Sequence, residues 1–249
     1  MWRKEDEDQL LAVWEMVKWV VWVDLEGFSC LHSRGEDTKG LLALRGLMGD
    51  LFHLGNRVYP AEGERLFIHQ VGDGFVVKPD FGDIDLLRPI SVGVALLRAS
   101  LLRGSCLKVG IGLGDLADVQ GCYPQEIQAS QEDGCVCIGA GLMTMFPVMG
   151  DGLVDSHAVS QKASGPLLIT RGDLIDVLPK AAIPIAEYRD HFEVDWVHAN
   201  LEEADQILTT LGLSCDAHQL EELLRSYLKL NTALRDNWRK AAQLLIRGY

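Results

Sequence analysis

Two short apolar segments that each lead to an aspartate constrain the fold most. Residues 19–23 are bulky and β-branched and end at Asp24, a pattern typical of a buried strand. Two more apolar runs flank Gly72-Asp73-Gly74, which indicates a β-hairpin with Asp73 at its tip. If the strands before the two aspartates are neighbours in one sheet, both carboxylates emerge at the same edge.

The rest of the first 184 residues alternates between helical and strand patterns. The predicted elements are helices at 3–17, 39–54, 85–102 and 152–163, strands at 19–23, 107–113, 143–149 and 167–170, and a hairpin at 66–78. Residues 115–134 are irregular and read as an excursion from the core. This order predicts an α/β (α+β) sandwich with one mostly antiparallel sheet and helices on one face.

The character of the sequence changes after Pro184. Residues 201–211 and 219–245 have helical spacing with many charges. We therefore divide the chain into a main domain at 1–184 and a helical C-terminal appendage at 185–249. The apolar stripe of the appendage either packs on the main domain or forms a dimer or partner surface. Its members are Leu220, Leu223, Leu224, Tyr227, Leu228, Leu234, Trp238 and Leu244.

Composition narrows the class of protein. The formal net charge of −13 argues against general nucleic-acid binding, which needs a basic surface, although local cations and metals can still hold one nucleotide. No apolar run approaches the ~18 residues that a membrane span needs. The six cysteines form no CxxC pair, so we expect reduced thiols in a cytoplasmic protein.

Asp24 and Asp73 are the strongest candidates for chemistry. Two carboxylates a few ångströms apart repel each other unless a cation lies between them. Mg²⁺ prefers such oxygen ligands together with substrate phosphates. The competing interpretation is that Asp24 caps a turn and Asp73 is an ordinary hairpin residue. The joint arrangement favours a metal pair.

Four segments resemble the signatures of class III nucleotide cyclases. Residues 21–31 resemble a strand that ends in aspartate before x-x-Gly-Phe-Ser/Thr, and residues 69–77 resemble the Gly-Asp hairpin. Residues 108–114 are similar to a strand of the form Arg-x-Gly-Ile-x-x-Gly, and residues 150–155 occupy the place of the Gly-Asp helix start. Their order agrees over about residues 18–171. The resemblance implies a ferredoxin-like cyclase sandwich.

The resemblance also implies a reaction, in which a nucleoside triphosphate is converted to a 3′,5′-cyclic monophosphate and pyrophosphate. Asp24 and Asp73 would be catalytic and would bind two divalent ions, Mn²⁺ or Mg²⁺, with the Leu25 carbonyl as a further ligand. Backbone N–H groups of Gly27, Phe28 and Ser29 would cradle the phosphates. Sites of this family form between two catalytic domains, so a homodimer is expected.

The sequence departs from the family pattern at the base reader. Purine cyclases carry lysine or glutamate where this chain has His69, whose reach is shorter. Tyr59 could fill the smaller pocket that a pyrimidine needs. The competing interpretations are a hydrogen-bonded strand residue for His69 and a packing or surface role for Tyr59.

A second departure concerns the transition-state cation. The asparagine and arginine expected on the Gly-Asp helix are replaced by Asp155 and Val159. His157 and Lys162 are the only cations on that helix and are the candidates for a phosphate or transition-state contact, although both also suit a solvated face. Another cation therefore substitutes, or the activity differs, or it is lost.

Within the family, residues 146–157 and 165–169 look closest to the stand-alone pyrimidine cyclases of bacterial Pycsar antiphage systems. This resemblance implies a UTP cyclase, or less favoured a CTP cyclase, whose product signals to a separate effector protein. The alternatives are a purine (adenylate or guanylate) cyclase with an unusual pocket, and a catalytically silent cyclase-like domain used for binding or dimerisation.

Overall fold

The computed structural model describes residues 18–28, 35–79, 86–114, 116–118, 122–132, 135–138, 140–144, 148–162, 164–179, 184–187 and 190–246. The helix expected at 3–17 lies outside them. The described residues form a seven-stranded sheet with the order β11-β12-β10-β4-β1-β3-β2. All neighbouring strands in it are antiparallel except β10 and β4, which run parallel. The predicted α/β class with a mostly antiparallel sheet is confirmed.

The first half of the chain forms the centre of this sheet. Its elements follow in the order β1 (Lys18–Leu25), α3 (Asp37–His53), β2 (Leu66–Val71), β3 (Gly74–Pro79), α4 (Leu87–Leu102) and β4 (Leu107–Gly114), and a π-helical turn, η1 (Leu54–Val58), extends α3. A βαββαβ chain whose strands lie in the order β4-β1-β3-β2 is a ferredoxin-like arrangement, as predicted. The buried, β-branched strand β1 lies in its middle.

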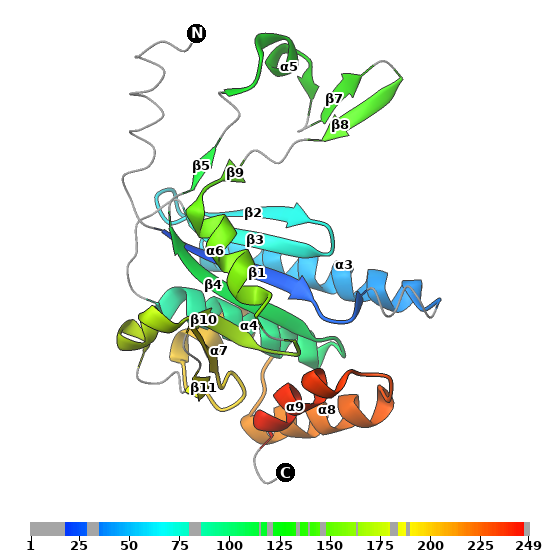
Figure 1. Ribbon diagram of the computed structural model, residues 1–249, viewed down its shortest axis with the longest axis vertical. Coiled ribbons are helices and arrows are strands. Elements are labelled where there is room, and N and C mark those ends of the chain that lie inside the picture. Colours follow the sequence, from blue (N-terminus) through cyan, green and yellow to red (C-terminus); the bar gives the residue numbers. More distant parts are fainter. Residues whose placement is uncertain are drawn as a thin grey trace.

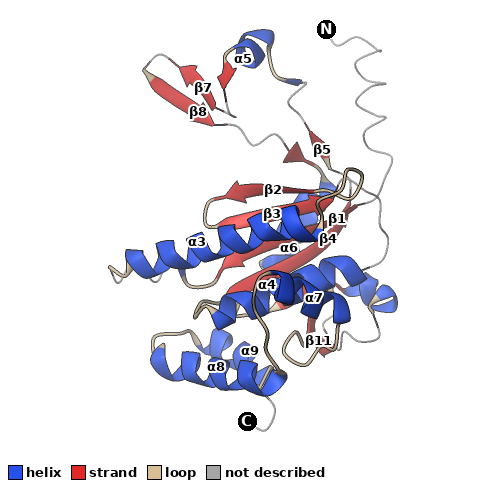
Figure 2. Cartoon of the chain, turned by 180° about the vertical axis from the view of Figure 1, so that it is seen from behind, coloured by secondary structure: helices blue, strands red, loops and turns tan. Residues whose placement is uncertain are grey.

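Helices cover both faces of the sheet, which corrects the expectation that they lie on one face. Gly93 of α4 packs on Val109 and Leu168, whereas Gly110 of β4 faces Ser160 of α6 (Asp151–Ser160). Because successive residues of a strand point to opposite faces, α4 and α6 lie on opposite sides. Figure 1 shows α6 in front of the sheet, and Figure 2 shows α3, α4 and α7 covering the other face.

The glycine-rich strand β4 explains how α6 approaches so closely. A Cβ atom at Gly110 would lie 2.8 Å from the Cβ of Ser160, and one at Gly112 would lie 2.5 Å from the backbone nitrogen of Ser156. Real Cβ atoms do not come that close, so α6 rests directly on the backbone of β4. The glycines of β4 therefore allow the close approach of α6.

The described residues between Ala117 and Met149 leave the main body (Figure 1), so the excursion extends beyond the predicted residues 115–134. Two short strands, β5 (Ala117–Asp118) and β9 (Val148–Met149), pair at the base. Beyond them lie α5 (Gln125–Ala129) and a small sheet of β6 (Gln131–Glu132), β7 (Cys135–Ile138) and β8 (Gly141–Thr144). The strand expected at 143–149 is therefore divided between β8 and β9.

The segment expected to be helical from residue 185 begins with strands. β10 (Leu168–Arg171) leads through the 3₁₀ helix η3 (Gly172–Val177) to β11 (Pro184–Glu187) and β12 (His191–Val194), and β12 pairs with β10. The helical character holds only from α7 (Glu202–Thr210) through α8 (Ala217–Leu230) to α9 (Asp236–Leu244). A buried four-residue strand is too short for a periodic signal, which is why the sequence did not reveal it. The division at residue 184 stays a prediction.

The apolar stripe of α8 and α9 packs on the main domain. Leu220, Leu224, Leu228 and Trp238 are buried in the same core as the central strands. Leu244 is an exception, because it is 51% exposed. The packing interpretation of the stripe is therefore confirmed for its buried members. Among the described residues, no helix has the length and hydropathy to cross a bilayer.

Candidate active site

The structure brings Asp24 and Asp73 together at one edge of the sheet. The cross-strand partner of Asp24 on β3 is Gly74, and Asp73 immediately precedes that glycine in the turn between β2 and β3. Burial raises the pKa of the Asp24 carboxyl, and the charge of Asp73 raises that pKa further. The two carboxylates are therefore close enough to interact electrostatically.

Lys108 lies beside Asp24 on β4, the strand that neighbours β1 on the side away from β3. Its Cα is the cross-strand partner of Asp24 on β4, and its side chain is only 9% exposed. The charge of Lys108 lowers the pKa of Asp24, against the effects of burial and of Asp73. Lys108 begins the segment 108–114, which resembles a family motif, but no role was predicted for it. Its place at the start of a strand with alternating glycines was the signal in the sequence that could have indicated one.

Glu26 holds Lys108 in place. Its Oε1 lies 3.4 Å from the Lys108 Nζ, and its backbone N–H donates to the Cys106 carbonyl at 2.9 Å. Burial raises the pKa of Glu26, and the charge of Lys108 opposes this rise. Lys108 thus lies between two carboxylates, Asp24 on one side and Glu26 on the other. Both are raised in pKa by burial, so the site as a whole favours added positive charge.

The turn after Asp24 is fixed by two residues of the predicted phosphate cradle. Gly27 has a φ of 83°, a left-handed conformation that favours glycine. The Phe28 ring packs on α3, where a Cβ added at Gly40 would lie 3.0 Å from its Cε2. Ser29, the third residue predicted for the cradle, lies outside the described residues. Leu25 lies between Asp24 and this turn, and the role of its carbonyl as a metal ligand stays a prediction.

His69 and His157 lie on the same face of the sheet as Asp24. His69 pairs with Val76, and Val76 pairs with Trp22, which places His69 two strands from Asp24, roughly 10 Å across the sheet and roughly 7 Å along the strands. The His157 ring comes from α6 and lies 4.5 Å from the Trp22 ring, measured between centroids. His157 also lowers the pKa of Asp24. Of the two candidate transition-state cations, His157 is the one that interacts with Asp24.

Tyr59 does not lie on this face, and Lys162 is engaged by another residue. Tyr59 is 7% exposed in the core on the α3 side of the sheet, and its hydroxyl donates to Glu203 of α7 at 3.4 Å. The packing interpretation therefore describes its position. Lys162 forms an ion pair with Asp190, next to the start of β12. It is already engaged by that carboxylate.

An arginine that the sequence analysis did not consider reaches the Gly-Asp helix. Arg171, at the end of β10, lies 3.3 Å from Asp155 Oδ2 and also pairs with Asp173. Asp155 in turn accepts from the backbone N–H of Leu113 at 3.3 Å. Val159, at the place of the expected arginine, is buried. A cation is thus present beside α6, but it comes from a neighbouring strand, where only the tertiary fold could reveal it.

The donor set suits a hard divalent cation. Among the described residues no cluster of three or more His, Cys, Asp or Glu side chains forms, so the protein offers two carboxylates and the Leu25 carbonyl. Mg²⁺ and Mn²⁺ accept few protein oxygens and complete their shell with water and phosphate oxygens. Burial and then the charge of Asp73 raise the pKa of Asp24, and a bound cation would favour the ionised carboxylate. The residues present therefore fit the predicted metals.

The sequence matches no protein-family model and no curated protein. The structure is similar to several solved cyclases. The guanylyl cyclase Cya2 superposes with a TM-score of 0.48 at 13% identity, over 72% of this chain and 91% of that one. The adenylyl cyclase CyaB from P. aeruginosa gives 0.44 at 11% identity, over 72% and 93%.

A third similar structure is a class III adenylyl cyclase-like ATP-binding protein from Pseudomonas aeruginosa, with a TM-score of 0.46 at 14% identity, over 78% of this chain and 40% of that one. Similarities at this level establish neither the family nor the activity of the chain. The case for function therefore rests on the residues of the site.

Proposed function

We propose that the protein is a nucleotide cyclase, which converts a nucleoside triphosphate to a 3′,5′-cyclic monophosphate and pyrophosphate. The observation that carries the proposal is the meeting of Asp24 and Asp73 at one sheet edge, with their charges coupled. Lys108 adds a buried cation beside them. Two carboxylates next to a fixed cation are suited to binding metal-complexed phosphates.

Each residue has a role in the proposed reaction. Asp24, Asp73 and the Leu25 carbonyl would hold two divalent ions, Mn²⁺ or Mg²⁺, which when bound lower the pKa of the ribose 3′-hydroxyl and neutralise phosphate charge. The N–H groups of Gly27 and Phe28 donate to phosphate oxygens. The 3′-hydroxyl gives its proton to water, its oxygen bonds to the α-phosphorus, the bond from that phosphorus to the bridging oxygen breaks, and pyrophosphate leaves. Lys108 lies where it can contact the leaving phosphates.

The decisive experiment incubates the protein with Mn²⁺ and each of the four ribonucleoside triphosphates and analyses the products by mass. A cyclic monophosphate that disappears in Asp73→Asn, while the circular dichroism spectrum is unchanged, supports the proposal. Asp118→Asn, in the excursion, is the matched control and retains activity. Absence of any cyclic product would favour the alternative, a catalytically silent cyclase-like domain.

We further propose a homodimer in which the two chains share their sites. Arg171 lies on β10, two strands from β1, and about four residues further along the sheet than Asp24. The Cα atoms of Arg171 and Asp24 are therefore about 16 Å apart within one chain. An arginine side chain does not span that distance. In a two-fold dimer, Arg171 of one chain could instead face the aspartates of the other.

Complementation tests this sharing. Asp73→Asn and Arg171→Ala homodimers would both be inactive, and co-expression of the two variants would restore about a quarter to a half of the activity through one intact site per heterodimer. If Arg171→Ala retains full activity alone, Arg171 is no part of the site.

For the base, we propose a pyrimidine, with UTP preferred to CTP. His69 lies two strands from Asp24 on the same face, where a base attached to the bound ribose would reach. Imidazole is shorter than the lysine side chain that reads a purine edge. The proposed product would act as an antiphage second messenger for a separate effector protein. Faster turnover of ATP or GTP than of UTP would instead identify a purine cyclase with an unusual pocket.

A further inference from the structure

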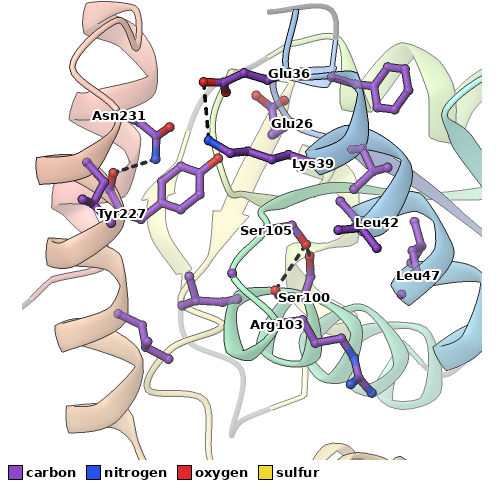
Figure 3. A pocket seen from close by; sticks show the side chains of 18 of the residues that line it. Glu26, Glu36, Lys39, Leu42, Leu47, Ser100, Arg103, Ser105, Tyr227 and Asn231 are labelled. Atoms are coloured by element: carbon purple, nitrogen blue, oxygen red, sulfur yellow. Dashed lines mark hydrogen bonds and ion pairs between the residues drawn. The ribbon is translucent and has the colours of Figure 1, made fainter. Parts of the chain in front are cut away.

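A cavity of about 610 Å³ lies on the other face of the sheet from Asp24. It is bounded by α3, by α8 and by the turn that joins α4 to β4, and Leu25 and Glu26 form part of its wall. Figure 3 shows α3 and α8 on opposite sides of the hollow. Its volume is in the range of small-molecule sites in proteins. The mechanism proposed above does not use it.

The walls of the cavity are mostly apolar. Leu42 and Leu47 project from α3, and Leu223, Tyr227 and Leu230 project from α8. Leu42 is 60% exposed and Leu230 is 83% exposed, so a large apolar side chain stands open to solvent on each helix. Exposed apolar groups that face a hollow from two sides are typical of a binding site and not of ordinary surface.

Among the described residues that line the cavity, the charged groups are already paired. The three pairs are Glu36 with Lys39 at 3.4 Å, Asp50 with Arg103 at 2.6 Å, and Glu26 with Lys108 at 3.4 Å. A charged ligand would have to break one of these pairs or lose its hydration without compensation. The cavity therefore favours an uncharged occupant.

Two hydroxyl groups supply the polar contact. The Oγ atoms of Ser100 and Ser105 lie 2.8 Å apart, and the Ser105 hydroxyl is also 3.3 Å from the Ser100 carbonyl oxygen. Because these contacts use the hydroxyl hydrogens, the pair offers mainly oxygen lone pairs to a ligand. A ligand with an N–H or O–H donor would complement them.

We infer that this cavity is a binding site for an uncharged small molecule with an apolar, ring-sized body and one hydrogen-bond donor. The apolar walls take the body, and the Ser100–Ser105 pair accepts from the donor. The inference does not depend on the proposed cyclase activity.

A matched pair of fluorescent probes tests the inference on the full chain. N-phenyl-1-naphthylamine is uncharged and has one N–H, and its 8-sulfonate has the same skeleton with a negative charge. We expect a saturable one-to-one titration with the neutral probe and binding of the sulfonate at least about tenfold weaker, since the sulfonate finds no unpaired cation among the described lining residues. Equal binding of both probes, or no saturable binding, would overturn the inference.

Variants locate the probe. Ala43→Phe places a ring inside the cavity, and Ala129→Phe adds the same ring on α5 as a control. Leu230→Asp puts a charge at an exposed wall position, where folding is not threatened, and Leu244→Asp on α9 is its control. We expect about tenfold weaker binding of the neutral probe in Ala43→Phe and Leu230→Asp only. Unchanged affinity in both of these variants would show that the probe binds elsewhere.

Discussion

The side chains of Asp24 and Leu25 point to opposite faces of the sheet. Asp24 lies beside Lys108 and the α6 helix, whereas Leu25 is packed with the helices of the other face and lines the cavity there. The Leu25 carbonyl is also a predicted metal ligand. One peptide segment therefore joins the candidate active site to the candidate ligand site.

This junction predicts coupling between the two sites. Occupation of the cavity by N-phenyl-1-naphthylamine should change the affinity for Mn²⁺, because the probe touches the residue that carries the carbonyl. Titration of Mn²⁺ by electron paramagnetic resonance, with and without the probe, measures the factor. By thermodynamic linkage the probe affinity must change by the same factor when Mn²⁺ is saturating. Ala43→Phe should remove the effect, and identical Mn²⁺ affinity in wild type with and without probe would refute the coupling.

Lys108 is expected to serve both stability and function. Lys108→Met leaves the Glu26 carboxylate buried without its cation, which should lower the free energy of unfolding by about 3 kcal/mol. Lys108→Arg keeps the charge and should recover most of the stability. Urea denaturation at pH 7.5 measures both. Lys229→Met, at the C-terminal end of α8, is the control and should change stability little. A Lys108→Met protein as stable as wild type would mean that the pair contributes nothing.

The contact between α6 and β4 predicts opposite effects for two glycine substitutions. Gly110→Ala forces a Cβ into Ser160 and should destabilise the protein by several kcal/mol or displace α6. Gly49→Ala, in α3, meets open space and should stabilise by about 0.5–1 kcal/mol. Thermal unfolding of the two variants provides the comparison. Equal midpoints would contradict the described packing.

Glu193 predicts a dependence of stability on pH. It is 3% exposed, and burial raises its pKa while His191 opposes the rise. Because the folded pKa lies above the unfolded one, the folded state binds more protons in the window above pH 4.5. The free energy of unfolding therefore falls as the pH rises through that window.

Glu193→Gln should flatten this dependence and raise the melting temperature at pH 7.5 by a few degrees. Glu187→Gln, on the exposed side of β11, is the matched control. Melting curves between pH 4.5 and 8 measure the slope, and an unchanged slope in Glu193→Gln would assign the dependence to another group.

The sequence predicted the parts of the fold that carry a strong local pattern. The β-branched run before Asp24, the hairpin around Asp73 and the helices α3 and α4 lie close to their expected bounds. The placement of α6 on the far face was not predictable from its own residues, because the information lies in the glycines of β4. The same is true of β12, whose four residues are recognisable only by their pairing with β10.

The candidate site divides in the same way. Asp24 and Asp73 could be found because each ends or turns a recognisable strand. Lys108 and Arg171 were missed because their roles depend on the register between β1 and β4 and on the position of β10 beside α6. Tyr59 was predicted to lie near the base because chain order does not show which face of the sheet a loop residue packs against. Side-chain partners across the sheet are the information that a single sequence lacks.

The register of β1 has a consequence for how the protein acquires its site. Asp24 obtains one neighbour from the β2–β3 turn and another from β4, and both segments follow it at long distance in the chain. Loop closure must therefore precede any clustering of charge. Before β4 joins the sheet, the chain has Asp24 and Asp73 but no lysine beside Asp24 and Glu26. If β1, β2 and β3 pair before β4 joins them, the carboxylates have no cation of the chain beside them, and a free divalent ion would stabilise that partial sheet.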